Sequence, residues 1–231
     1  MQTLTYKYTL PLMLAACIAA YALFALVPAL DLAVTRAFYA NGAFWGKGVA
    51  WLHTMRMVFW NLSLVSVLLC LIALSLGYSQ NWPARLMPMR DWNVIFWGFT
   101  LGTGVLVNAI LKGYSGRPRP RDVTEFGGDA VFRAVGQWDG SCTDDCSFVS
   151  GEVSGTTVFC LACMIVIQHH APRLGPRWSM LAYLAVAASF GFVFLHRVVT
   201  GGHFLSDAIM ATLLTALVVV LIARYWPQTR R

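Results

Sequence analysis

The sequence predicts an all-α, polytopic membrane protein with six transmembrane helices and a polar loop between the third and the fourth. Of its 231 residues, 58% are hydrophobic and 12% are charged, whereas a soluble domain contains roughly 25% charged residues. The mean hydropathy is +0.63, and apolar runs long enough to cross a bilayer recur along the chain. These observations exclude a soluble enzyme, a nucleic-acid-binding domain and a disordered linker. We expect residues 1–231 to form a single domain.

Six apolar windows are the expected spans. They cover residues 9–30, 58–76, 94–111, 153–167, 178–195 and 204–226. The first window lacks a small-residue cleavage site, so we interpret it as an anchor rather than a signal peptide. The segment 36–56, rich in aromatic residues, is expected to form a short helix lying in the membrane interface.

The segment 112–152 is the one long polar loop, and such a loop in a compact protein is usually functional. It contains Cys142 and Cys146, the two cysteines that lie outside apolar sequence. Their spacing is compatible with a disulfide on an oxidising face of the membrane and equally with two free thiols.

The distribution of Lys and Arg does not by itself orient the chain, because the two sets of connecting segments carry almost equal numbers. When the basic residues of the candidate site are set aside, the remainder favours both termini inside. The formal net charge of +7 then belongs to the inner loops, where it suits anionic membrane lipids.

Three polar clusters stand at the ends of predicted spans, at 112–120, 147–152 and 196–207. The loops after the third and the fifth span are separated by two crossings. All three clusters can therefore converge at one membrane face, whichever way the chain inserts.

The first chemical feature of these clusters is a set of cations beside helix amides. Lys112, Arg119 and Arg197 are fixed positive charges, and the backbone donors at Ser150 and Gly151 stand where a span begins. Such a group matches the oxygens of a phosphoryl group. Charge density alone makes Arg117 an additional candidate. Each cation taken singly could equally anchor in lipid headgroups, and Ser150 could only cap a helix.

The second feature is a pair of residues four positions apart at the start of the last span. His203 and Asp207 share a helical face, so the carboxylate can orient the imidazole, and an oriented imidazole can attack phosphorus. Asp207 lies inside an apolar run, where an ionisable group indicates function. The joint occurrence of cations, amides and this pair favours a catalytic site over membrane anchoring.

These residues resemble the type 2 phosphatidic acid phosphatase (PAP2) superfamily over 112–207. Lys112 and Arg119 fit its Lys-x6-Arg-Pro motif, Ser150-Gly151 fits the core of its second motif, and the third motif is matched by three residues: Arg197, His203 and Asp207. The resemblance implies a six-helix membrane phosphatase that needs no metal and no cofactor. It implies His203 as the nucleophile, Asp207 as its orienting partner, and phosphate binding by the other motif residues.

One position departs from the family pattern. The second motif usually ends in a histidine that protonates the leaving group, whereas this chain has Glu152. We expect Glu152 to supply that proton, which requires a raised pKa that nearby cations oppose. His196 is a further candidate, and a leaving group that needs little protonation is the alternative.

Within the family, the chain most resembles bacterial lipid A phosphatases. The expected protein lies in the bacterial inner membrane with its site facing the periplasm, and its partners are a lipid phosphate substrate and membrane lipids, with no nucleic acid. Undecaprenyl pyrophosphate phosphatase and phosphatidylglycerophosphate phosphatase are the alternatives within the family. A vanadate-dependent haloperoxidase-like protein and a non-catalytic transporter are the alternatives from other classes. The sequence indicates no oligomeric state.

Overall fold

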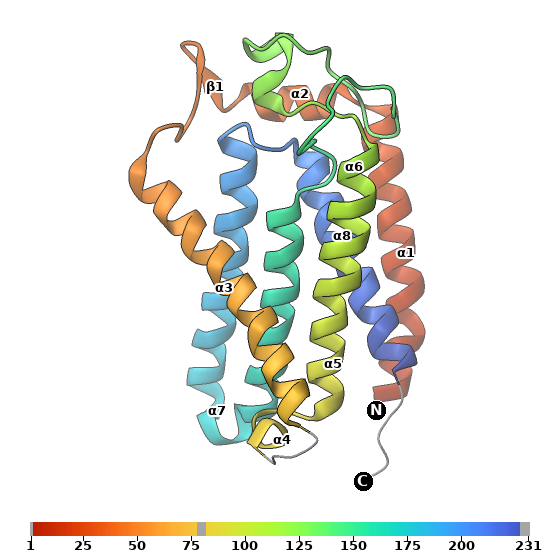
Figure 1. Cartoon of the computed structure of the whole chain (residues 1–231), viewed down its shortest axis with the longest axis vertical. Coiled ribbons are helices and arrows are strands. Elements are labelled where there is room, and N and C mark those ends of the chain that lie inside the picture. The colour runs from red at the N-terminus through yellow and green to blue at the C-terminus, as the bar shows by residue number, and fades with distance from the viewer. Residues whose placement is uncertain (1, 78–81, 227–231) are drawn as a thin grey trace.

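The computed structural model describes residues 2–77 and 82–226, and most of them are helical (Figure 1). Within this part of the chain, five helices are long and apolar enough to cross a membrane. They are α1 (Gln2–Leu26), α3 (Ala50–Leu76), a continuous rod of α5 (Met89–Trp97), η1 (Gly98–Leu111) and α6 (Lys112–Tyr114), then α7 (Gly151–Val199) and α8 (Leu205–Tyr225). The protein is therefore a mostly helical, multi-pass membrane protein, as the composition predicts.

The helix α7 contains both the fourth and the fifth of the predicted spans. Its 49 residues are interrupted at Gly175, where φ is 76° and ψ is 165°, a conformation that glycine adopts without a steric penalty. The two arms on either side run side by side in Figure 1, and the Cys160 Sγ on one arm lies 3.8 Å from the Val186 carbonyl oxygen on the other. The six separate spans stay a prediction, because the two arms of α7 count together as one of the five candidate spans.

The predicted interfacial helix over 36–56 is wrong. After α2 (Ala29–Arg36), the chain forms a two-stranded hairpin of β1 (Tyr39–Ala40) and β2 (Ala43–Phe44), and α3 begins only at Ala50. The dipeptide Asn41-Gly42 forms the turn with φ values of 53° and 77°, which is the typical composition of a tight hairpin turn. Hydropathy and aromatic content do not register this turn signal, and for that reason they suggested a helix.

The polar loop lies at one end of the helices, above the ends of α6 and α8 (Figure 1). It contains two short 3₁₀ turns, η2 (Pro120–Asp122) and η3 (Thr124–Phe126). Phe126 packs in an aromatic cluster with Tyr39 and Phe44 of the hairpin. The hairpin and the loop therefore cover the same end of the molecule.

The packed interior lies where α1, η1, α7 and α8 meet, and it includes Phe24, Val107, Val153 and Ala208. The outer surfaces of α1 and α3 are apolar and exposed instead. Leu12 and Ile18 of α1 are 70% and 69% exposed, and α3 leaves a row of leucines and valines uncovered. Exposed apolar side chains at this density are expected where lipid replaces water as the solvent.

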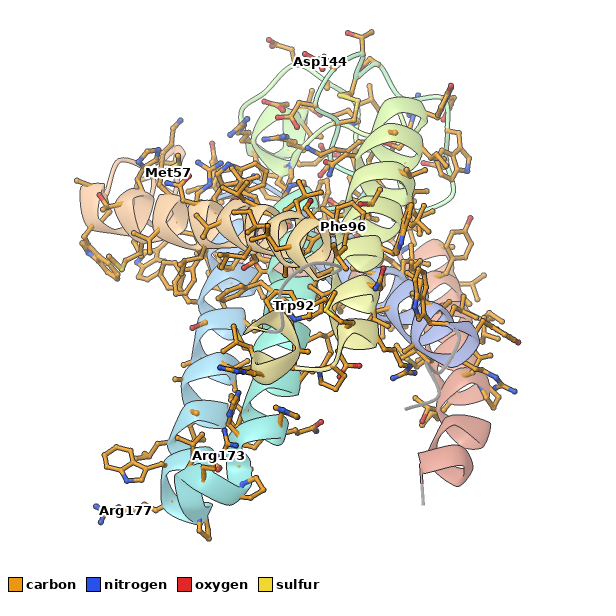
Figure 2. The ribbon with its side chains drawn as sticks, turned by 60° about the horizontal axis from the view of Figure 1, so that its bottom comes forward. Met57, Trp92, Phe96, Asp144, Arg173 and Arg177 are labelled. Atoms are coloured by element: carbon orange, nitrogen blue, oxygen red, sulfur yellow. A yellow bond between two sulfur atoms is a disulfide. The ribbon has the colours of Figure 1, made fainter. Side chains whose placement is uncertain are left out.

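The two ends of the molecule differ in character. Figure 2 shows Arg173 and Arg177 at the turn between the arms of α7, far from the loop that carries Asp144. The short helix α4 (Trp82–Leu86) lies at the same end as this turn (Figure 1). The polar clusters predicted from the sequence are all at the opposite end.

Candidate active site

A cavity of about 330 Å³ lies at the loop end of the helices and collects most of the predicted site residues. It is lined by residues from α3, the rod, the loop, both ends of α7 and the connection between α7 and α8: Arg56, Met57, Trp60, Asn108, Lys112, Arg119, Asp145, Gly151, Glu152, Arg197 and His203. Three sequence clusters that are up to about ninety positions apart thus meet around one space, as the alternation of spans predicts.

His203 stands in the short connection between α7 and α8, and its side chain is almost fully buried. Its Nδ1 lies 2.8 Å from the Ser147 carbonyl oxygen. A carbonyl oxygen only accepts hydrogen bonds, so Nδ1 carries the proton and Nε2 keeps a free lone pair. Burial lowers the pKa of His203 to about 4, and the charge of Arg197 acts in the same direction against the opposing effect of Asp207. The imidazole is therefore neutral at pH 7, as a nucleophile must be.

Asp207 is completely buried. Its closest partners are Ser147, the Phe204 backbone and Arg117 rather than His203. Its carboxylate accepts hydrogen bonds from Ser147 Oγ at 2.5 Å and from the Phe204 backbone N–H at 2.9 Å. The distance from His203 Nδ1 to Asp207 Oδ2 is 3.9 Å. Asp207 thus reaches His203 chiefly through Ser147, whose hydroxyl bonds the carboxylate and whose carbonyl bonds the imidazole.

Arg117 does not line the cavity. Its guanidinium is buried and forms ion pairs with Asp207 Oδ1 at 2.5 Å and with Asp31 Oδ2 at 2.8 Å. It also lies over the Phe204 ring, with Cζ 4.5 Å from the ring centroid. Two carboxylates compensate the charge of Arg117. Arg117 therefore packs beneath the segment that carries His203 and does not face the cavity.

Lys112 and Arg119 both form ion pairs with one carboxylate, that of Asp145. The Arg119 Nε also donates to the Asp145 backbone carbonyl at 3.0 Å. Burial raises the pKa of Asp145, but hydrogen bonds and charge from Lys112 and Arg119 outweigh this effect and lower the pKa overall. The ionised carboxylate of Asp145 thus neutralises part of the charge of Lys112 and Arg119, the two cations of the first motif. Cys142 and Cys146 form a disulfide, with Cα atoms 5.7 Å apart, that closes the short loop containing Asp145.

Glu152 lines the cavity between two guanidiniums. Arg56 donates to it from Nε at 2.8 Å and from a terminal nitrogen at 2.5 Å, and Arg197 NH1 lies 3.4 Å from the same carboxylate. These contacts favour the ionised carboxylate. A proton-donating Glu152 therefore needs a change in its surroundings when substrate binds.

Ser150 and Gly151 begin α7 at the edge of the cavity. Ser150 is buried and caps the helix by accepting a hydrogen bond from the Val153 backbone N–H at 3.4 Å. Gly151 lines the cavity, and a Cβ there would lie 2.6 Å from Asn108 Oδ1. The absence of a side chain lets the first turn of α7 approach Asn108, so the start of the helix, at Gly151 and Glu152, stands beside the cavity.

His196 lies in a neighbouring cavity rather than in this one. The residue is 8% exposed, and Nδ1 has no hydrogen-bond partner among the residues that the structure describes.

Within residues 2–77 and 82–226 there is no group of three or more His, Cys, Asp and Glu residues that could hold a metal ion.

Sequence reasoning missed several residues of this site. The sequence places Arg56 in the segment predicted to be an interfacial helix, whereas the structure pairs it with Glu152 across 96 positions of sequence. The sequence does not single out Asp31 or Asp145, and Ser147 enters only as the first residue of the cluster 147–152. A basic residue near the start of a long apolar run, as Arg56 is, was the one available signal.

The structure combines a mostly helical membrane fold with a cavity in which buried His203 lies beside four basic side chains, those of Arg56, Lys112, Arg119 and Arg197. The sequence profile of the PAP2 superfamily matches residues 93–231. The chain belongs to the PAP2 superfamily.

Curated relatives share a single description. The lipid A 4'-phosphatase of Rhizobium leguminosarum is 31% identical over 174 residues, which cover 74% of this chain and 71% of that protein. The lipid A 4'-phosphatase of Francisella tularensis subsp. novicida is 32% identical over 110 residues, covering 47% of this chain and 46% of the relative. The matched region thus spans about half the length of the Francisella relative.

A solved structure supports the fold. The crystal structure of a transmembrane PAP2 type phosphatidylglycerolphosphate phosphatase from Bacillus subtilis aligns with a TM-score of 0.57, covering 96% of this chain and 100% of that chain. The sequence identity is 17%. This similarity extends the family fold to segments before residue 93.

Proposed function

We propose that this protein is a membrane-embedded lipid phosphate phosphatase that works through a phosphohistidine intermediate, with a lipid A-type phosphorylated glycolipid as its substrate. The observation that carries the proposal is the state of His203. Its Nδ1 proton is held by the Ser147 carbonyl, and the ring lines the same cavity as Lys112, Arg119 and Arg197. The substrate class is drawn from the curated relatives that are lipid A 4'-phosphatases.

The reaction takes two displacements at phosphorus. In the first, His203 Nε2 forms a bond to phosphorus while the bond to the lipid oxygen breaks, and the departing oxygen takes up a proton. In the second, water forms a new P–O bond, the P–N bond breaks, and inorganic phosphate leaves with His203 restored. The cations and the amides of the first turn of α7 offset the charge on the phosphoryl oxygens in both steps.

The proposed topology has six crossings, because each arm of α7 is long enough to cross about 30 Å of hydrocarbon on its own. The site then opens at the periplasmic face of the inner membrane. The disulfide at the site end supports this orientation, since disulfides persist on oxidising faces. Labelling of Cys142 and Cys146, after reduction, by a thiol reagent that does not cross the inner membrane tests it, and absence of labelling in intact spheroplasts would contradict it.

Phosphate release by the purified protein tests the function. The substrates are lipid A, undecaprenyl pyrophosphate, phosphatidylglycerophosphate and phosphatidic acid, presented in one neutral detergent. The proposal expects the highest kcat/KM with lipid A. Highest kcat/KM with another member of the panel would keep the phosphatase and replace the substrate, and no release from any of them would refute the function.

Glu152 is proposed as the proton donor to the leaving oxygen. A bound phosphate offers acceptors to Arg56 and Arg197, and its negative charge disfavours a second anion beside it, so binding shifts Glu152 towards its protonated form. The substitution Glu152→Gln is expected to lower kcat by about 10²-fold on a phosphate monoester and much less on undecaprenyl pyrophosphate, whose leaving group needs little protonation. The measurement is kcat on both substrates. Wild-type turnover of the monoester by the variant would exclude Glu152 as the required acid.

Asp145 is expected to compete with the substrate phosphate, since its carboxylate pairs with the same Lys112 and Arg119. The substitution Asp145→Asn removes the competing charge and should lower the inhibition constant of inorganic phosphate by about fivefold, the scale of one exposed ion pair. Inhibition curves at fixed substrate measure it. Asp144→Asn is the matched control, because Asp144 is exposed and in no ion pair among the described residues. Equal inhibition constants for both variants would show that Asp145 does not occupy the phosphate site.

A further inference from the structure

A second cavity, of about 480 Å³, lies beside the first. Arg56 and Arg197 line both, so these two guanidiniums form the boundary between them. The rest of the lining comes from the turn and first residues of α3 at 46–54, from Arg121 in the loop, and from the end of α7. None of the catalytic steps above uses this space.

The second cavity carries an excess of positive charge. Its lining contains Lys47 and Arg121 in addition to the two shared arginines, and no acidic residue is among its lining residues. In the first cavity, by contrast, Asp145 and Glu152 offset the cations. The carboxylate nearest Arg121 is that of Asp122 at 3.7 Å, and both side chains are about half exposed. Within the described residues Lys47 takes part in no ion pair.

Two buried nitrogen atoms of these lining residues lack partners. His196 Nδ1 and Arg197 Nε have no hydrogen-bond partner among the described residues, although the two residues are only 8% and 6% exposed. Buried polar groups are nearly always satisfied, and an exception calls for a physical explanation, of which a bound anion is one. The oxygens of an anion would accept from Arg197 and, with the ring in its Nδ1-protonated form, from His196.

We propose that this second cavity binds a second phosphate group on the headgroup of the same lipid whose first phosphate is hydrolysed at His203. The inference rests on the proposed function. A phosphate dianion matches the charge excess and could accept from Arg197 Nε and from a protonated His196 Nδ1, and the shared guanidiniums place the two anion sites side by side. The substrate class is thereby narrowed to lipids with two separate phosphate groups.

The test compares two substrates that share one scissile phosphate. One is a bisphosphorylated glucosamine disaccharide lipid, and the other is its monophosphorylated counterpart, which retains only the phosphate that wild-type protein removes. The quantity measured is the ratio of kcat/KM for the two in a neutral detergent. The wild-type ratio is expected to be about tenfold in favour of the bisphosphorylated lipid, as two partly exposed ion pairs would give.

The variants Lys47→Gln and Arg121→Gln should each lower this ratio by about threefold, and the double variant should bring it close to one. Arg121→Lys keeps the charge and should retain most of the ratio. Arg173→Gln, at the far end of α7 (Figure 2), should keep the wild-type value.

The outcomes separate this inference from the proposed function. Hydrolysis of both lipids with a wild-type ratio of one, or a ratio that the double variant leaves unchanged, overturns the second phosphate site and leaves the phosphatase intact. Loss of the ratio on adding excess phosphatidylglycerol also overturns it, because a bystander membrane lipid would then be the occupant. No hydrolysis of either lipid refutes the proposed function itself.

Discussion

The substitution His203→Ala is expected to reduce the release of phosphate by at least about 10⁴-fold with every substrate that the wild type hydrolyses. Loss of a covalent nucleophile leaves only binding and charge stabilisation, which do not replace the missing bond to phosphorus. The measurement is single-turnover phosphate release by purified protein. A labelled phosphate that stays on the wild-type protein in base and is lost in acid would identify the phosphohistidine directly.

His170→Ala is the matched control for this loss. His170 lies in α7 at the end of the molecule away from the site. Its Nε2 is 2.9 Å from the Leu86 carbonyl oxygen. It should retain wild-type turnover and wild-type labelling. Full activity of His203→Ala alongside full activity of this control would remove the nucleophile from the mechanism, and the proposed function would then need another one.

The site residues that the sequence could predict are those that lie at the ends of predicted membrane spans. Lys112 and Arg119 stand at one end of a predicted span, and His203 stands at the end of another. Alternation of crossings then places them on one face, whatever the packing between helices is. Prediction of Glu152 and Gly151 in the cavity follows from the same reasoning.

The rest depended on tertiary contacts that no local pattern reports. Arg56 pairs with Glu152 and Asp31 pairs with Arg117, across 96 and 86 positions. Whether a cation faces phosphate or a buried carboxylate is decided by how the helices pack, so charge density could not distinguish Arg117 from Arg119. The hairpin after α2 was missed for a different reason, because a search for apolar windows gives no weight to the turn residues Asn41 and Gly42.

The buried cluster around Arg117 gives the largest expected effect on stability. Two carboxylates, Asp31 and Asp207, share this one guanidinium, and all three side chains are almost fully buried. The substitution Arg117→Met leaves both carboxylates without their cation and should cost about 3–5 kcal/mol, the usual penalty for breaking a buried pair from one side. For a chain of this size that lowers the midpoint of thermal unfolding by about 10 °C. The measurement is intrinsic fluorescence during heating in detergent.

Asp31→Asn should cost much less, although it removes a residue of the same cluster. The cluster has two negative charges and one positive charge, so removal of one carboxylate charge leaves a matched pair between Arg117 and Asp207. The asparagine oxygen can still accept from the Ser206 backbone N–H, which lies 2.9 Å from the present carboxylate. Charge matching therefore predicts an order, with Arg117→Met far less stable than Asp31→Asn.

The same reasoning predicts a rescue. Asp31→Leu introduced into Arg117→Met removes one of the two uncompensated carboxylates, so the double variant should unfold at a higher temperature than Arg117→Met alone. Arg177→Met, an exposed arginine at the opposite end (Figure 2), controls for loss of an arginine side chain as such. An Arg117→Met protein that unfolds with the Arg177→Met control, or a double variant less stable than Arg117→Met, would mean that Arg117 does not hold the segment of His203 in place through its charge.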